Sequence, residues 1–223
     1  YLSRYAAFRE AQISKFILQE ATCVLAGAWN IAIINPQWIA NKILNMPEGT
    51  PIQLEVGIGP VVSVRANIQD LYFIPTNERL IINPTKEEDK LFQLTDTVVQ
   101  GLLKTLPYTP ILAIGYNFAY ELEGSENFAV KTDFTPSCCK DIYSDIGAMN
   151  GPESIMIHSL VLADERTAVL NMSFKLKENI KYLNLNYHYQ VDNDSEKIQL
   201  ALGKFYKSYQ HAKIACAKLI SKQ

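Results

Sequence analysis

The chain has 223 residues, 48% of them hydrophobic and 20% charged, a composition that predicts a folded globular core and excludes a disordered chain. The formal net charge of −2 offers no basic excess to neutralise phosphates, which argues against nucleic acid as a partner. No apolar run approaches the ~18 residues needed to cross a bilayer, so we expect no membrane partner.

The opening segment, residues 1–20, intersperses apolar residues with charged ones, and we expect an amphipathic and helical segment there. A long apolar strand is predicted next, over 22–34. It leads into a short helix over 36–44, because Asn35 suits the capping position before a helix and Pro36 suits its first turn.

Short strands and one long helix complete a first half, residues 21–109. The strands are bounded by Gly, Pro and Asn, and they are predicted at 52–58, 60–66, 70–74 and 79–83. The helix is predicted over 85–105. Thr85 followed three residues later by Glu88 has the spacing of a capping box at its start.

The second half, residues 110–223, begins with a strand over 111–122 that is apolar on both faces and is therefore expected to be central in the sheet. The segment 124–152 has no clear pattern, and long segments of this kind are functional or mobile. Three further strands with hairpin turns between them are predicted at 154–162, 167–176 and 180–191.

One continuous last helix is predicted from Asp194 or Ser195, either of which can cap it. It carries an apolar stripe at alternating spacings of four and three: Ile198, Leu202, Phe205, Tyr209, Ala212, Cys216 and Leu219. This stripe is the internal packing face of the helix or, as the less favoured alternative, a dimer seam.

The predicted fold class is α+β: an antiparallel sheet with helices packed on one face, in one compact domain. The two halves repeat the same order of long strand, short helical or irregular piece, antiparallel strands and long helix. This pseudo-duplicated order is similar to the topology of the TATA-binding-protein fold. The chain carries no sequence motif of that family and lacks the charge of a DNA saddle, so the likeness implies a fold and no function.

Residues 182–191, YLNLNYHYQV, alternate strictly between apolar and polar side chains, which predicts a strand with one buried face. Its polar face carries no charge if the histidine is neutral. We expect that face to point away from the helices, on the open side of the sheet. A solvated strand face is the simpler interpretation, and the candidate binding residues are Asn184, Asn186, His188 and Gln190.

Motifs for catalysis or for cofactors are not found. The other two histidines, His158 and His211, are assigned structural or surface roles, because no neighbouring motif supports catalysis. The cysteines show neither a disulfide framework nor metal-ligand spacing: Cys23 and Cys216 look like core residues, and Cys138 and Cys139 are adjacent. We therefore expect no metal, no cofactor and a reducing, cytoplasmic compartment.

Two functions remain open at this stage. The first is a non-enzymatic binding or assembly module of a soluble, bacterial-type protein, acting through a protein partner or as a homo-oligomer. The alternative is a small-molecule receptor or enzyme with a pocket between the sheet and the 124–152 loop. That pocket would use Asn186 and His188 together with Asp133, Asp141 or Asp145.

Overall fold

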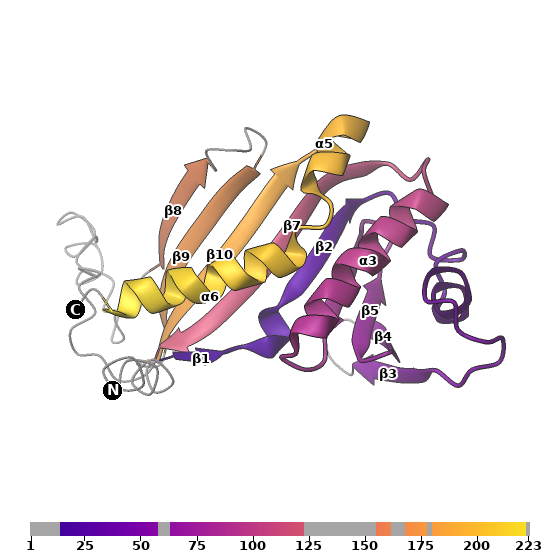
Figure 1. The fold of residues 1–223 in the computed structure, drawn as a ribbon, viewed down its shortest axis with the longest axis horizontal. Helices are drawn as coiled ribbons and strands as arrows, with labels where there is room; N and C mark the ends of the chain where they lie inside the picture. Colours follow the sequence, from indigo (N-terminus) through magenta and orange to yellow (C-terminus); the bar gives the residue numbers. More distant parts are fainter. Residues whose placement is uncertain (1–13, 58–62, 123–154, 162–167, 178–179, 222–223) are drawn as a thin grey trace, which may run out of the picture.

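The chain folds into a mostly antiparallel sheet with helices on one face, as a computed structural model shows (Figure 1). The α+β class predicted from the sequence is confirmed. The structure describes residues 14–57, 63–122, 155–161, 168–177 and 180–221.

From residue 22 to the first long helix, the elements follow the predicted order closely. The strands are β1 (Ser14–Phe16), β2 (Thr22–Gly27), β3 (Gln53–Gly57), β4 (Ser63–Ile68), β5 (Leu71–Pro75) and β6 (Arg79–Pro84). The helical elements are the 3₁₀ turn η1 (Leu18–Glu20), α2 (Pro36–Trp38), the π-helical η2 (Ile39–Ile43) and α3 (Asp89–Thr105). The cap before α2 is confirmed, because the Asn35 side chain accepts a hydrogen bond from the Trp38 N–H at 2.9 Å.

The remaining elements complete the sheet and cover it. The strands are β7 (Ile111–Leu122), β8 (Ile155–Val161), β9 (Ala168–Lys177) and β10 (Ile180–Gln190), and the helices are α5 (Ser195–Ala201) and α6 (Phe205–Ser221). The strand order is β3-β4-β5-β6-β2-β7-β10-β9-β8, with β1 pairing to β7. In the described part of the chain each of these pairs is antiparallel. The position of β7 between β2 and β10 confirms that it is a central strand.

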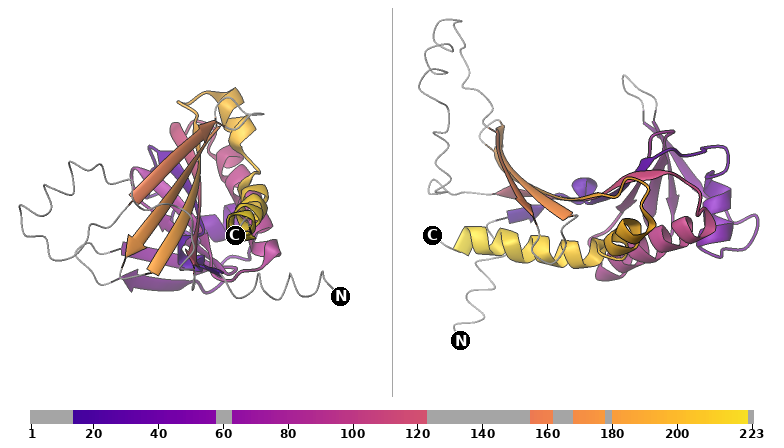
Figure 2. Two further views of the ribbon diagram at one scale, coloured as in Figure 1. Left: turned by 90° about the vertical axis from the view of Figure 1, so that its left-hand side faces the viewer. Right: turned by 90° about the horizontal axis from the view of Figure 1, so that it is seen from above.

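Both long helices, α3 and α6, lie on the same face of the sheet and contact each other (Figure 2). The sheet curves away from them, so its other face is concave; we call this the open face. The core lies between helices and sheet, and its centre is aromatic. Phe92 of α3 stacks on Tyr209 of α6 with ring centroids 3.8 Å apart, and Phe118 of β7 stacks on Phe205 at 5.3 Å.

The apolar stripe of the last helix is confirmed as a packing face, because Phe205, Tyr209, Ala212 and Cys216 are all buried. The alternative, a dimer seam, is wrong for these residues. The prediction of a single helix is also wrong. The chain breaks between α5 and α6 at Gly203, whose φ of +70° is a left-handed conformation that suits glycine.

Two predicted boundaries are wrong for reasons that lie in turns. The strand predicted over 22–34 ends at Gly27, and its remaining apolar residues form a turn in which the Asn30 side chain accepts a hydrogen bond from the Ala32 N–H at 3.1 Å.

The capping box at Thr85 does not form, and the helix starts at Asp89. The Thr85 N–H instead donates to the Asp70 carbonyl at 2.9 Å, which ties this segment to the turn before β5.

The opening segment is only partly described. Residues 14–20, for which a helix was predicted, form β1 and the 3₁₀ turn η1, because β1 pairs with β7 in the sheet. The predictions for residues 1–13 and for the 124–152 segment lie outside the described residues, as do Asp133, Asp141, Asp145, Cys138 and Cys139. Among the described helices, none is long and apolar enough to cross a membrane.

Candidate functional site

The polar residues of β10 lie on the open face of the sheet. Leu183, Leu185, Tyr187 and Tyr189 are buried toward the helices, so the residues between them point the other way. The predicted site residues Asn184, Asn186 and His188 are half-buried there, and Gln190 is exposed. The orientation expected from the alternating sequence is therefore observed.

Asn186 is the centre of a hydrogen-bonded row that crosses four neighbouring strands. The strand register places Asn186 opposite Asn171 of β9 and Asn117 of β7, and Asn117 opposite Thr22 of β2. Asn171 Nδ2 donates to Asn186 Oδ1 at 3.0 Å, Asn186 Nδ2 donates to Asn117 Oδ1 at 2.7 Å, and Asn117 Nδ2 donates to Thr22 Oγ1 at 2.9 Å. We call these four residues the amide row.

Polar residues continue this line toward the other edge of the sheet. The register of β2 and β6 places Asn83 opposite Thr22, one step beyond the pair Cys23–Ile82. From there the pairs are Asn83–Tyr72, Tyr72–Asn67 and Asn67–Gln53. Each strand from β9 to β3 therefore contributes an uncharged polar residue to one line across the open face.

Asn83 shows why part of this line is structural. Its side chain is only 9% exposed, and its Nδ2 donates to the carbonyls of Leu18 at 3.0 Å and Ala21 at 2.7 Å. These bonds anchor the 3₁₀ turn η1 against the sheet. A buried amide with both of its N–H groups satisfied in this way is not free to bind a ligand.

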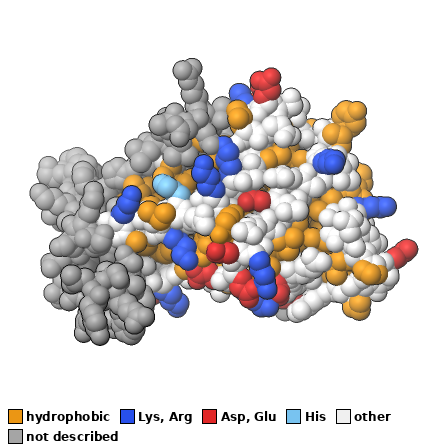
Figure 3. Space-filling model, viewed as in Figure 1, with side chains coloured by type: hydrophobic (Ala, Val, Ile, Leu, Met, Phe, Trp, Pro, Cys, Tyr) orange, Lys and Arg blue, Asp and Glu red, His pale blue; other side chains and the backbone are white. Residues whose placement is uncertain are grey.

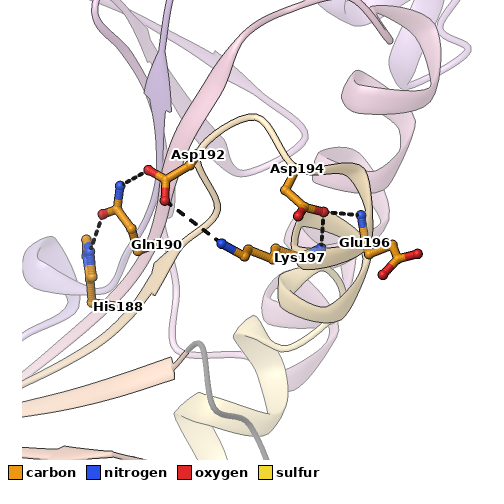
Figure 4. A network of polar contacts seen from close by, with 6 residues as sticks. All are labelled: His188, Gln190, Asp192, Asp194, Glu196 and Lys197. Carbon is orange, nitrogen blue, oxygen red and sulfur yellow. Dashed lines mark hydrogen bonds and ion pairs between the residues drawn. The ribbon is translucent and has the colours of Figure 1, made fainter.

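His188 and Gln190 belong to a separate network at the end of β10 (Figure 4). His188 Nε2 donates to Gln190 Oε1 at 3.2 Å, and Gln190 Nε2 donates in turn to Asp192 Oδ1. Asp192 lies 4.0 Å from Lys197 of α5 and has a φ of 49°, in a tight turn between β10 and that helix. Asp194 then caps α5 by accepting from the Glu196 and Lys197 N–H groups, as predicted.

Among the described residues, His188 has no direct carboxylate partner. The Gln190 amide accepts from its Nε2 and separates the imidazole from the Asp192 carboxylate. On the neighbouring strands His188 lies opposite Gly115 and Val169, which have no ionisable group. Within the described ranges, no group of three or more His, Cys, Asp or Glu residues could hold a metal ion.

His211 has a partner that its sequence position did not reveal. Its Nδ1 lies 2.6 Å from the Tyr187 hydroxyl, on the helix side of β10. Burial lowers the pKa of His211, and the nearby positive charge of Lys218 lowers it further. Burial raises the pKa of the Tyr187 hydroxyl well above its usual value, so the hydroxyl stays protonated and shares a hydrogen bond with His211 Nδ1. The structural role assigned to His211 fits this geometry.

The centre of the open face differs in charge from the helix-covered face. On the helix-covered face, side chains of both signs are interspersed with apolar ones (Figure 3). On the open face, the central strands β2 and β7 contribute Thr22, Val24 and Ala26 together with Ala113, Gly115 and Asn117. This part of the open face can therefore interact through hydrogen bonds and shape, without a formal charge.

The structure divides the four predicted site residues rather than gathering them into one site. Asn186 belongs to the amide row, His188 and Gln190 belong to the network before α5, and Asn184 lies between Ala119 and Ser173 of the adjacent strands. Sequence reasoning missed the partners of Asn186. Asn117 and Asn171 each lie in a predicted strand, but nothing in the local pattern indicates that they share a register with Asn186.

Comparisons with known proteins add no assignment: no family model matches the chain, and neither curated proteins nor solved structures give a match.

Proposed function

We propose that this chain is a non-enzymatic binding module that holds a partner protein on the open face of its sheet. The observation that carries the proposal is the amide row of Asn171, Asn186, Asn117 and Thr22. It is hydrogen-bonded across four strands on the concave side, opposite the long helices α3 and α6. The row is already ordered by its own bonds, so binding would immobilise few side chains, which reduces the entropic cost of association.

The chemistry of the row favours a protein partner. An asparagine amide has two N–H donors and two acceptor lone pairs. Within the described residues, Asn186 uses one donor toward Asn117 and one lone pair toward Asn171, which leaves one of each for a ligand. Backbone peptide groups supply the matching acceptor and donor. The uncharged centre of the face also fits the depletion of charged residues in the cores of protein interfaces.

The proposal includes the pseudo-duplicated topology. It is supported by the central position of β2 and β7, the first long strands of the two halves, which pair antiparallel. It is further supported by the two long helices, α3 and α6, which end the halves and contact each other on one face. If the halves are related by duplication, superposing 21–109 on 110–223 in a crystal structure will overlay β2 on β7 and α3 on α6.

A cytoplasmic site of action belongs to the proposal as well. Cys23 and Cys216 are buried free thiols, and burial raises the pKa of each above its ordinary value. Thiols in that state are unreactive core residues and are compatible with a reducing compartment.

The test is partner capture from the native host with cross-linking and mass spectrometry. An Asn184→Arg variant adds a charge to the open face beside the amide row without removing any of the row's hydrogen bonds. Ile214→Arg is the control, because Ile214 is 54% exposed on helix α6. The proposal requires a protein whose cross-links map to the open face, lost in Asn184→Arg and retained in Ile214→Arg.

Two results would contradict this proposal. One is a partner that both variants bind equally, which would place the interface elsewhere. The other is no captured protein together with strong thermal stabilisation by a metabolite or nucleotide, which would favour the alternative of a small-molecule receptor or enzyme.

A further inference from the structure

The strand β3 forms one edge of the sheet, and none of its five residues is a lysine or a proline. It pairs with β4 on one side, and no other strand of the described residues pairs with its outer side (Figure 1). Natural proteins usually guard such edges with lysines, prolines, bulges or inward charges, because the unpaired backbone groups can bind another strand. The strand itself, Gln53–Gly57, has a single charged residue, Glu55.

The charge of Glu55 is engaged within its own sheet. Glu55 Oε2 lies 2.6 Å from Arg65 Nη2, and Glu55 Oε1 accepts from the Tyr72 hydroxyl at 2.9 Å. Arg65 also lies over the Tyr72 ring, 4.2 Å from its centroid. The hydrogen bond from Arg65, followed by that from Tyr72, lowers the pKa of Glu55, so the carboxylate stays ionised and paired. It therefore guards the edge less than an unpaired charge would.

The other face of β3 is apolar and exposed. Leu54 is 57% exposed and Val56 is 59% exposed. Val64 of β4, which pairs directly with Val56, is 48% exposed. An open edge that carries exposed branched side chains at alternate positions can accept a second strand with the same pattern.

We propose that β3 pairs antiparallel with β3 of a second copy of this chain, about a two-fold axis at Leu54. The register then places Leu54 opposite Leu54 of the partner subunit, Gln53 opposite Glu55 of the partner subunit, and Ile52 opposite Val56 of the partner subunit. In a two-fold interface every such contact occurs twice. The two sheets become one continuous sheet across the axis.

Self-complementarity is the reason for choosing a second copy as the occupant. In this register each apolar residue meets an apolar residue and each amide meets a carboxylate. Gln53 Nε2 already lies 3.3 Å from Glu55 Oε1 within one chain, so the amide is placed on the same face as its new acceptor. Centring the axis on Glu55 would oppose two carboxylates, which is unfavourable, so the charges favour the Leu54 register over that one.

This interface is independent of the binding function proposed for the open face. The paired segment is short, so the contact lies at the small end of stable interfaces and the dimer should form in a concentration-dependent way. Sedimentation equilibrium of the full chain over a wide concentration range is the direct measurement.

A Leu54→Lys variant tests the register, because it places two ammonium groups opposite each other at the axis. We expect it to raise the dimer dissociation constant about tenfold or more, through lost apolar burial and like-charge repulsion. Leu112→Lys is the matched control, since Leu112 is a strand leucine that is 55% exposed. Circular dichroism confirms that both variants stay folded.

Oxidative cross-linking supplies a second readout that does not depend on weakening the dimer. Residues directly opposite in antiparallel strands are close enough for a disulfide. Leu54→Cys should therefore give more covalent dimer on oxidation than Leu112→Cys or the parent chain. A monomer at all concentrations, a dimer unaffected by Leu54→Lys, or a β3 edge that pairs with a different protein overturns the proposal.

Discussion

Asp96 of α3 caps the N-terminus of α6, although it lies 109 positions before Phe205 in the sequence. Its Oδ1 accepts from the Phe205 N–H at 2.9 Å and its Oδ2 accepts from the Tyr206 N–H at 3.0 Å. The carboxylate thus replaces the local cap that a helix following Gly203 would otherwise need. It also holds the two long helices together on the sheet.

Replacing Asp96 by alanine should therefore destabilise the chain. Loss of a helix N-cap costs about 1–2 kcal/mol, and the two N–H groups would be left in a half-buried position. Asp96→Asn keeps one acceptor oxygen and should cost less. Urea unfolding at neutral pH measures both; equal stability of the parent and Asp96→Ala would show that water replaces the cap.

The pH dependence of this cap has a definite sign. Burial raises the pKa of Asp96 above its ordinary value of 3.8, and the backbone hydrogen bonds from Tyr206 and Phe205 only partly oppose that shift. The folded state therefore favours the protonated acid. The contribution of protonated Asp96 to stability is fully present below the ordinary pKa, and it is lost as the pH rises through the raised pKa. The stability of the parent relative to Asp96→Asn should fall between about pH 4 and neutrality. A constant difference over that range would contradict the prediction.

Asn186→Ala should break the amide row at its centre. It removes the bonds to Asn171 and Asn117 and leaves their amides without those partners, at a cost of about 1–3 kcal/mol. Asn184→Ala is a matched control on the same strand and face, because the Asn184 side chain makes no hydrogen bond in the described part of the chain. We expect its free energy of unfolding to change by less than about 0.5 kcal/mol. If both variants cost the same, the row contributes nothing specific.

Acid should weaken the packing of α6 through His211. Burial lowers the pKa of this histidine below its ordinary value of 6.5, so the neutral form is favoured in the fold. Its contribution to stability is present above the ordinary pKa and is lost as the pH falls toward the lowered pKa. His211→Gln keeps a group that can form a hydrogen bond with the Tyr187 hydroxyl but does not titrate. The unfolding free energy of this variant should decline less than that of the parent from about pH 7 to about pH 5. If the two unfolding free energies fall equally over that range, His211 does not cause the acid sensitivity.

Gly203→Ala should destabilise the break between α5 and α6 for two separable reasons. A φ of +70° costs an alanine about 1 kcal/mol, and its Cβ would lie 2.6 Å from the end of the Gln100 side chain. Gly49 has a φ of +79°, and a Cβ added there would meet nothing within 4 Å, so Gly49→Ala reports the backbone cost alone. Combining Gly203→Ala with Gln100→Ala should recover the steric part. Thermal unfolding of the parent, the single variants and the double variant measures both costs. If the double variant recovers no stability, the Gln100 side chain moves aside and there is no steric cost.

The sequence alone predicted the features that depend on neighbouring residues. Strict alternation located β10 and its buried tyrosines, and an apolar pattern on both faces identified β7 as central. The cap at Asn35 and the cap at Asp194 follow from short-range side-chain bonds to the next turn of the helix. Periodicity and capping are local properties, and for that reason they can be read without a tertiary structure.

Local patterns failed where a distant group decided the outcome. Thr85 and Glu88 have the spacing of a capping box, but the Thr85 N–H donates to the Asp70 carbonyl and the helix begins later. The apolar stripe from Ile198 to Leu219 continues across Gly203 without interruption, yet the helix breaks there. Asp96 supplies from α3 the cap that permits the break.

The amide row was decided by the tertiary structure alone. Asn186 and Asn117 are 69 positions apart, and Asn117 and Thr22 are 95 positions apart. Sliding β7 by two residues would keep Ile114, Tyr116 and Phe118 on the helix side, so the alternating pattern cannot select one register over another. The packing of the helix-facing side chains selects it, and that packing aligns three asparagines and a threonine across the open face.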